Sequence, residues 1–359
     1  MLRLRTSARS AVVTVAAALL VLAGCSTGPS GSSPATPPAT PAAATGGASS
    51  AADANAYPVT IKHAFGETSI TQTPRRIVTL GWTDADHVAA LGVAPVGAPK
   101  VTWGGNAKLS SDWFDKQLAV IGGAAPTRFD DADGAPIEEI AKLSPDLILA
   151  TNSGLTKVEY DKLSKLAPVV AYPKVAWGTP WKESLEIIGT ALGRSTQAAA
   201  VEAETEQTLA DAKAKYPQLE GKTFIYGFVT PADYSQVGYY TPLDLRPRML
   251  TELGMKNAPV IEKLSGDSKE FYRTVSAEQA ATLDSDILLT YIEDDAEVAA
   301  MRKDPLIGQI PAVKAGAVVA TKDKRVGLTT SSPSPLSIPF MVDLFVPTVA
   351  EAVANAEAS

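Results

Sequence analysis

The sequence predicts an α/β protein with two similar lobes, each built on a mostly parallel sheet, joined by one long helix. Apolar strand-like runs alternate with helical patterns along the chain, which is typical of βαβ units. The segment Ile137–Leu149 recurs as Ala277–Leu289, with Glu, Ala, Leu, Asp and Leu at matching places, which suggests one copy in each lobe. Between the copies, Ser195–Tyr216 has neither Gly nor Pro and only a narrow apolar stripe. That stripe favours a strut between lobes; a surface helix of one lobe is the alternative.

The N-terminus has the features of a lipoprotein signal peptide. Three arginines precede an apolar stretch, Ala11–Leu22, that is short for a membrane span. Leu22-Ala23-Gly24-Cys25 then looks like a bacterial lipobox, in which Cys25 carries the lipid, although an ordinary secretory signal with a stray cysteine is the alternative. We therefore expect residues 1–24 to be removed. Residues 25–56, almost entirely Ser, Gly, Pro, Ala and Thr, would form a lipidated cysteine and disordered tether.

The rest of the chain divides around the long helix. We expect an N-terminal lobe over residues 57–194, the interlobe helix over 195–217 and a C-terminal lobe over 218–359, sizes that suit single domains. The first lobe would begin with an edge hairpin. The predicted strands are Arg76–Leu80, Asp146–Ala150, Val169–Ala171, Thr223–Phe228, Ile287–Tyr291 and Val318–Ala320. The last helical stretch is Leu336–Ala354, which two prolines interrupt.

Composition excludes several functions. The formal net charge is −7, and no basic stretch is long enough to follow a phosphate backbone, so nucleic acid is not an expected partner. Cys25 is the only cysteine, and His63 and His87 are the only histidines, too few for a metal site held by the protein. Nucleophile elbows, glycine-rich nucleotide loops and paired catalytic side chains are also missing, so we expect no enzyme, no catalytic residue and no cofactor. We expect a monomer.

Aromatic and arginine side chains mark a candidate ligand site. Trp82 and Ser153 follow the C-terminal ends of predicted parallel strands, where open α/β sheets place their ligands. Tryptophan and tyrosine faces with arginine forks suit a bulky, oxygen-rich ligand. Core packing is the alternative for each tryptophan, and an ion pair with Asp244 is the alternative for Arg246. The predicted ligand-binding residues are Trp82, Trp103, Ser153, Trp177, Tyr239, Arg246, Arg248 and Tyr291.

Several segments, each weak alone, together resemble the ferric-siderophore-binding lipoproteins of ABC importers. They are the lipobox, Pro74–Val78, Leu91–Gly97, Glu138–Leu149, Leu163–Pro168, and Arg246 with Leu253-Gly254. The resemblance runs from about Tyr57 to Val349. It implies two Rossmann-like lobes joined by one long helix, with the ligand in the cleft between them. The implied function is capture of an Fe(III)-siderophore at the outer face of the cytoplasmic membrane, where the lipid anchors the protein, and delivery to an ABC permease for iron uptake.

The resemblance also gives the repeated segment a role. Family members dock on their permease through one surface glutamate of each lobe, and the matching positions here are Glu138 and Glu278. Stabilisation of a helix end is the alternative, and Glu139 beside Glu138 leaves open which of the two points outward. Iron would be held by the siderophore's own oxygens, without protein metal ligands. Hydroxamate, catecholate and citrate ligands all remain open. Haem or cobalamin is the alternative ligand. A cell-envelope enzyme is a more remote alternative function.

Overall fold

The computed structural model describes residues 52–358. The expected signal peptide, Cys25 and most of the expected tether lie outside the described residues. Ordered contacts begin before Tyr57, where the first lobe was expected to start. The Asp53 N–H donates to the Gly193 carbonyl (2.6 Å), and the Asp53 carboxylate accepts from the Thr196 N–H (2.9 Å). This carboxylate therefore satisfies a free N–H in the first turn of the long helix, a role that the expected tether did not anticipate.

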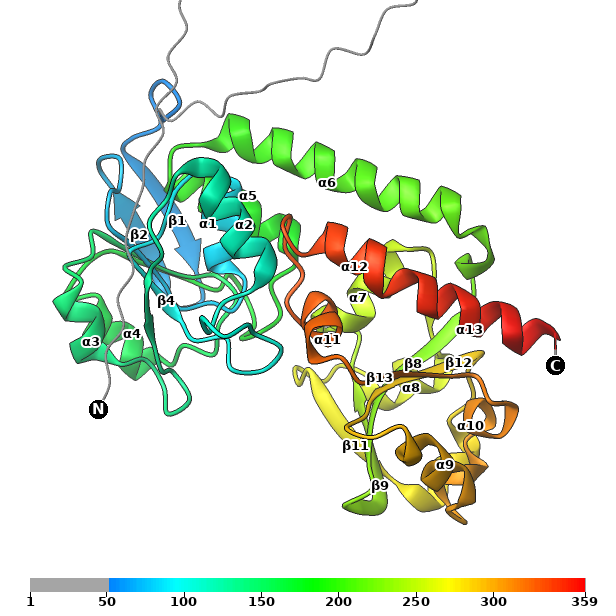
Figure 1. Ribbon diagram of the computed structural model, residues 1–359. Helices are drawn as coiled ribbons and strands as arrows, with labels where there is room; N and C mark the ends of the chain where they lie inside the picture. Colours follow the sequence, from blue (N-terminus) through cyan, green and yellow to red (C-terminus); the bar gives the residue numbers. More distant parts are fainter. Residues whose placement is uncertain (1–51, 359) are drawn as a thin grey trace, which may run out of the picture. The chain divides into compact units, whose positions relative to one another are not determined.

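The first lobe is built on a five-stranded sheet in the order β5-β4-β3-β6-β7, with every pair parallel. Its strands are buried apolar runs because helices cover both faces (Figure 1). The predicted edge hairpin forms as an antiparallel pair, β1–β2. The elements of this lobe are β1 (Val59–His63), β2 (Gly66–Ile70), β3 (Ile77–Thr79), α1 (Asp84–Ala90), β4 (Gly97–Pro99), α2 (Asp112–Ile121), β5 (Thr127–Phe129), α3 (Ile137–Lys142), β6 (Leu147–Ala150), α4 (Lys157–Leu163), β7 (Val169–Ala171) and α5 (Trp181–Ala191).

The second lobe holds a mixed sheet in the order β11-β9-β8-β12-β13, with β10 also paired to β8. β8, β12, β13 and β10 pair in parallel, whereas β9 and β11 add an antiparallel meander. The elements are η1 (Pro217–Leu219), β8 (Thr223–Thr230), β9 (Asp233–Tyr240), α7 (Leu245–Glu252), β10 (Lys256–Asn257), α8 (Pro259–Ser265), β11 (Tyr272–Ser276), η2 (Ala277–Thr282), β12 (Ile287–Tyr291), α9 (Ala296–Lys303), η3 (Ile307–Gln309), α10 (Pro311–Ala315), β13 (Val318–Thr321), α11 (Lys324–Ser331), α12 (Ile338–Leu344) and α13 (Val346–Ala358).

The repeated segment has the same architectural role in both lobes. Its aspartate precedes a central strand and holds the start of the neighbouring parallel strand. Asp146 accepts hydrogen bonds from the Arg75 and Arg76 N–H groups, just before β3 (2.8 and 2.7 Å). Asp286 accepts one from the Thr223 N–H at the start of β8 (2.6 Å). These charge-assisted bonds satisfy strand-end donors and fix which strands become neighbours.

The long helix α6 (Ser195–Lys215) joins the lobes, as the fold prediction required (Figure 1). Its buried side chains, Ala198, Thr205, Leu209 and Ala212, form a narrow stripe facing α5 and α12. Pro217 follows directly and prevents the α-helix from continuing. A helix with one narrow buried face is a strut that contacts both lobes, rather than the core helix of either.

The chain crosses back toward the first lobe near its C-terminus, although residues 218–359 were expected to stay in the second. Ser334 donates a hydrogen bond to Asp86 of α1 (2.8 Å), and the Phe340 ring lies 5.6 Å from the Trp113 ring of α2. The stretch Ile338–Ala356 has the length and hydropathy of a membrane span. Several of its apolar side chains, such as Met341 and Val349, are fully buried in the core, which accounts for part of that composition.

Candidate ligand-binding site

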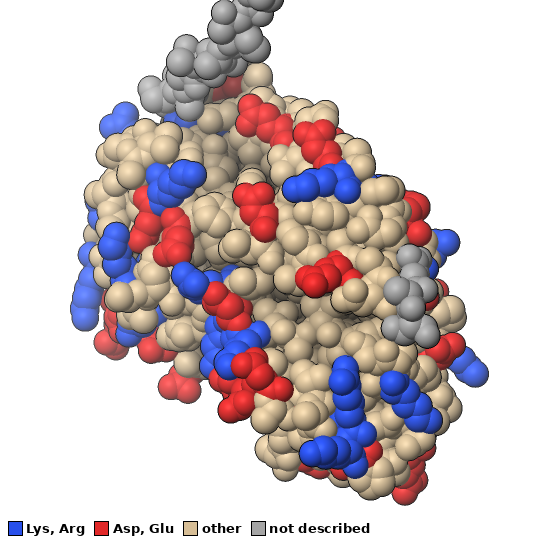
Figure 2. All heavy atoms as spheres, turned by 45° about the vertical axis from the view of Figure 1, so that its right-hand side comes forward, with Lys and Arg blue, Asp and Glu red and all other residues tan. Residues whose placement is uncertain are grey.

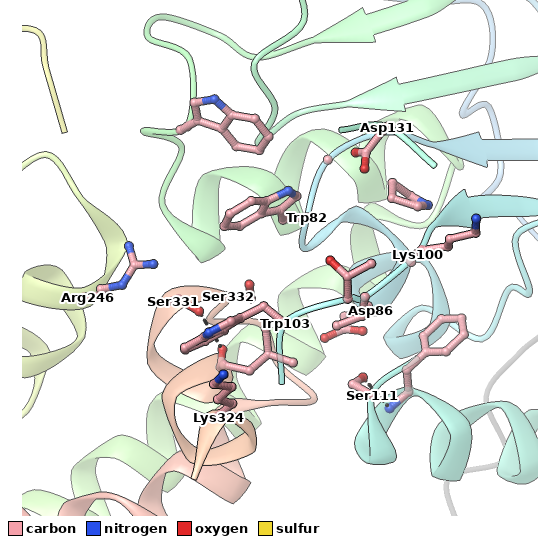
Figure 3. Close-up of a pocket in the computed structure, with 18 of the residues that line it drawn as sticks. Trp82, Asp86, Lys100, Trp103, Ser111, Asp131, Arg246, Lys324, Ser331 and Ser332 are labelled. Atoms are coloured by element: carbon pink, nitrogen blue, oxygen red, sulfur yellow. Dashed lines mark hydrogen bonds between the residues drawn. The ribbon is translucent and has the colours of Figure 1, made fainter. Parts of the chain in front are cut away.

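A cavity of about 740 Å³ lies between the two lobes. The first lobe contributes the loops that follow β3, β4 and β5, at the carboxyl ends of parallel strands where ligands are expected. The second lobe contributes residues of β8, β9, α7, β12 and α11. Figure 3 shows side chains from these separate segments around the cavity. The volume lies within the range of natural small-molecule sites.

Two tryptophans form one wall. The Trp82 and Trp177 rings lie 4.9 Å apart, and Trp82 is 53% exposed although it is a large apolar side chain. The segment Asn152–Gly154 after β6 positions both. The Asn152 carbonyl accepts from the Trp82 N–H (3.2 Å), and the Ser153 carbonyl accepts from the Trp177 N–H (3.1 Å). A ligand therefore meets a preformed aromatic surface.

Glycine at position 154 is part of this arrangement. A Cβ atom there would lie 2.6 Å from Nε1 of Trp177 and 2.8 Å from two of its ring carbons. Trp177 itself has φ of 59°, a left-handed conformation that non-glycine residues seldom adopt. The hydrogen bond to Ser153 and the space over Gly154 hold it in that conformation.

A second aromatic contact crosses between the lobes. The Trp103 ring, from the loop after β4, meets the edge of the Tyr291 ring at the end of β12, with centroids 5.2 Å apart. Gly327 of α11 leaves room for both, because a Cβ there would come within 2.7 Å of each ring. Trp103 and Tyr291 therefore close one side of the cavity, one from each lobe.

Arg246 is held rigidly beside this contact. It lies in the first turn of α7, and Asp244 caps that helix by accepting from the Arg246 N–H (2.8 Å). The same carboxylate accepts from the guanidinium at 2.9 and 3.0 Å, and Nε donates to the Tyr291 hydroxyl (3.0 Å). The guanidinium carbon lies 4.2 Å from the centre of the Tyr240 ring. The ion pair with Asp244 thus exists, but it is buried and positions Arg246 at the cavity (Figure 3).

Two tyrosines near Arg246, Tyr240 and Tyr226, remain neutral phenols at physiological pH. Burial raises the pKa of Tyr240 to about 12. Burial likewise raises the pKa of Tyr226, whose hydroxyl lies 3.0 Å from that of Thr330 and donates to Tyr291 (3.2 Å). For Arg246, burial alone would lower the pKa, but the Asp244 carboxylate and the surrounding tyrosine hydroxyls together raise it, so the guanidinium stays charged.

Five of the predicted residues line the cavity: Trp82, Trp103, Trp177, Arg246 and Tyr291. Ser153 does not; it is buried, and its hydroxyl donates to the Ala150 carbonyl (2.9 Å). Arg248 does not line it either, because its guanidinium donates to the Gly178 carbonyl (3.0 Å) and so braces the Trp177 loop from the other lobe.

The prediction that Tyr239 binds the ligand is wrong. It is only 2% exposed and packs in the core, whereas its neighbour Tyr240 lines the cavity. Successive side chains of a strand point to opposite faces, so only one of two adjacent tyrosines can face the ligand.

Sequence reasoning missed a ring of charged side chains. Lys100 and Asp130 follow β4 and β5, and applying the strand-end rule to those short strands would have found them. Acidic runs such as Asp130-Asp131 and the one that begins at Glu293 are usually solvated faces, and here these three carboxylates also line the open cavity. Arg128 and Lys324 complete the ring.

Asp86 joins the cavity wall to the returning C-terminal segment. Its carboxylate accepts from the Trp113 indole N–H (2.6 Å) and from the Ser334 hydroxyl (2.8 Å). Burial raises the pKa of Asp86 to about 6, so the carboxylate is still mostly ionised at pH 7.

Both histidines lie away from the cavity lining. His87 is fully buried, with its ring nitrogens 2.7 Å from the Thr83 carbonyl and 3.0 Å from the Trp181 carbonyl. His63 lies 2.9 Å from the Thr68 hydroxyl in the β1–β2 hairpin. Within residues 52–358, no group of three or more His, Cys, Asp or Glu side chains could hold a metal ion.

The glutamates of the repeat are on the surface. Glu138 lies in the first turn of the α-helix α3, and Glu278 lies in the first turn of η2, a 3₁₀-helix. Both are exposed, and so is Glu139. Neither Glu138 nor Glu278 forms a salt bridge with another described residue.

Comparison with known proteins gives consistent matches. The sequence model of the family described as periplasmic binding protein matches residues 77–324. The probable siderophore-binding lipoprotein YfiY of Bacillus subtilis is 30% identical over 245 residues, 66% of this chain and 70% of that protein. The ferric enterobactin-binding periplasmic protein FepB of Escherichia coli is 27% identical over 275 residues, 74% of this chain and 84% of that protein.

A solved structure extends the likeness over both lobes. The structure of PiaA from Streptococcus pneumoniae in complex with ferrichrome superposes with a TM-score of 0.77 at 33% identity, covering 83% of this chain and 99% of that one.

Proposed function

We propose a function from the family to which this chain belongs, the periplasmic binding protein family, in which it is a substrate-binding protein of the ferric-siderophore ABC importers. Its interlobe cavity captures an Fe(III)-siderophore for delivery to a permease. The observation that carries the proposal is the cavity itself, whose exposed aromatic faces surround the fixed cation Arg246. Such a site suits a bulky ligand with many oxygen acceptors. The protein works outside the cytoplasm, as its family does.

Iron is carried entirely by the siderophore. The cavity offers oxygen and nitrogen hydrogen-bond donors, and its half-buried Tyr240 is a neutral phenol rather than the phenolate that would bind ferric iron. Haem is less well supported, because an axial ligand is usually His, Cys, Met or an ionised Tyr. The protein contributes recognition and orientation of the intact complex.

Titration of the purified protein tests this function directly. We expect at least one ferric siderophore to quench tryptophan fluorescence and to release or absorb heat in calorimetry, because Trp82, Trp103 and Trp177 line the cavity. The panel contains hydroxamate and catecholate complexes, ferric citrate, haem and cobalamin, and each iron-free siderophore serves as the matched control. If only haem or cobalamin binds, the alternative cargo is correct; if none of the panel binds, the proposal is wrong.

Lipid anchoring at Cys25 and docking on the permease complete the proposal. The lipobox supports the anchor, and the relative YfiY is itself named a lipoprotein. The exposed glutamates of the repeat support docking, because each sits at a helix start on a different lobe. Carboxylates without an internal partner are available for cations on the permease surface.

The variant Glu138→Ala/Glu278→Ala is expected to bind ligand normally but to lose iron uptake by cells. Both side chains are exposed and away from the cavity, so neither folding nor ligand affinity should change. Uptake of radioactive iron by cells carrying the variant provides the measurement. Glu139→Ala/Gln279→Ala, which alters the neighbouring exposed side chains, is the matched control and should transport normally. Normal uptake by the first variant would remove the docking role.

A further inference from the structure

The charged side chains that line the cavity are balanced. Its cations are Lys100, Arg128, Arg246 and Lys324. Its anions are Asp86, Asp130, Asp131 and Glu293. Asp244, which holds Arg246, lies just behind this wall and is ionised beside it. The wall therefore offers no net positive charge to a ligand.

Each cation already has an anionic neighbour. Lys100 pairs with Asp130 (3.5 Å), and Lys324 pairs with Glu293 (2.9 Å). On the face drawn in Figure 2, lysine and arginine side chains likewise lie beside aspartate and glutamate in several places.

The two arginines are also compensated. The Arg246 guanidinium and the Asp244 carboxylate are 2.9 Å apart, with only 12% and 6% of their side chains exposed. Arg128 donates to the Pro99 carbonyl and the Ser110 hydroxyl, lies over the Phe114 ring, and feels the negative charge of Asp86. No cation is left over to neutralise an incoming anion.

This balance discriminates between ferric complexes by charge. Three catecholates, each with two negative charges, leave the ferric complex trianionic, whereas three hydroxamates, each with one, leave it neutral. Removing a trianion from water without compensating cations carries a large desolvation penalty. The net charge of −7 on the whole chain adds a further repulsion.

The remaining surface suits a neutral complex with oxygen acceptors. Trp82, Trp103 and Phe228 are 53%, 37% and 41% exposed, and their apolar faces are covered most favourably by a ligand without net charge. Arg246 uses Nε and one terminal nitrogen on Tyr291 and Asp244. Its second terminal nitrogen, Nη2, has no hydrogen-bond partner among residues 52–358 and can donate to a hydroxamate oxygen.

We propose that the natural ligand is a neutral ferric trihydroxamate, and that the matched charges of the cavity wall exclude trianionic catecholate complexes. The proposal rests on the proposed function, because it assigns the ligand class of the same cavity.

Calorimetry of the purified protein with ferrichrome, ferric enterobactin and ferric citrate tests the assignment. Ferrichrome is expected to bind at least about 100-fold more tightly than the trianionic catecholate complex. Its affinity should change less than about threefold between about 0.05 and 0.5 M NaCl, because a neutral ligand has no net charge to screen. Tighter binding of enterobactin or citrate would overturn this inference alone, whereas binding of no iron chelate would overturn the proposed function as well.

The variant Asp130→Asn/Glu293→Gln tests the role of the charge balance. It leaves Lys100 and Lys324 unpaired, and both altered carboxylates are well exposed, so the fold should be retained. The ratio of the affinity for ferric enterobactin to the affinity for ferrichrome is expected to rise at least about tenfold, because only the charged complex gains from the two unpaired lysines. Lys100→Gln/Lys324→Gln, the matched variant of opposite charge, should not improve enterobactin binding. An equal change for both complexes, or no change for either, would overturn the role of the charge balance.

Discussion

Replacing Arg246 with alanine is expected to lower siderophore affinity by about 10- to 100-fold and to destabilise the protein by about 3–5 kcal/mol. The loss of affinity follows because the cation fixed between Tyr240 and Tyr291 disappears from the second-lobe wall. The loss of stability follows because Asp244, only 4% exposed, would remain buried without its cation. Calorimetric titration and urea unfolding measure the two effects separately.

A double variant separates the two effects of Arg246. Asp244→Asn/Arg246→Met removes both charges, so no buried charge is left alone and most of the stability should return. Ligand affinity should remain low, because the donor to the ligand is still missing. Recovery of affinity in the double variant, or full stability in Arg246→Ala, would contradict this account of the ion pair.

The variant Gly154→Ala is expected to weaken siderophore binding by at least about tenfold, with a much smaller effect on stability. The new methyl group would lie 2.6 Å from the Trp177 indole nitrogen, so the ring must move away from Trp82 and from its place in the wall. The variant therefore tests the position of the Trp177 ring. Ligand titration measures the loss of affinity, and a change in tryptophan fluorescence emission reports the movement of the ring.

Gly178→Ala is the matched control for this variant. It lies next to Trp177 in the same loop, but its added methyl group would make only ordinary contacts, with the nearest atoms 3.5 Å away. It should bind ligand like the unaltered protein. If Gly178→Ala weakens binding as much as Gly154→Ala, the effect belongs to the loop as a whole and the Trp177 ring is not the cause.

The sequence was sufficient to predict the parallel parts of the fold. Runs such as Leu147–Ala150 are apolar on every residue because both faces of a parallel sheet are covered, and this pattern is visible without a structure. The repeat also carried architectural information, since Asp146 and Asp286 hold equivalent strand starts.

Other features depended on contacts between distant residues. β4 and β5 have three residues each, too few for a periodic pattern, so the charged side chains that follow them went unnoticed. Tyr239 and Tyr240 are the same residue type, and only the pairing of β9 with β8 and β11 decides which one faces the ligand. The return of Ser334 to Asp86 joins segments 248 residues apart, which no local pattern reveals.

That return has a mechanical consequence. Because the chain passes between the lobes through α6 and again through the segment around Ser334, the lobes cannot swing apart about a single hinge. An empty and a loaded receptor would then differ little in outline. A bound ligand would instead change how firmly Trp103 of the first lobe and Arg246 of the second lobe are held together across the cavity.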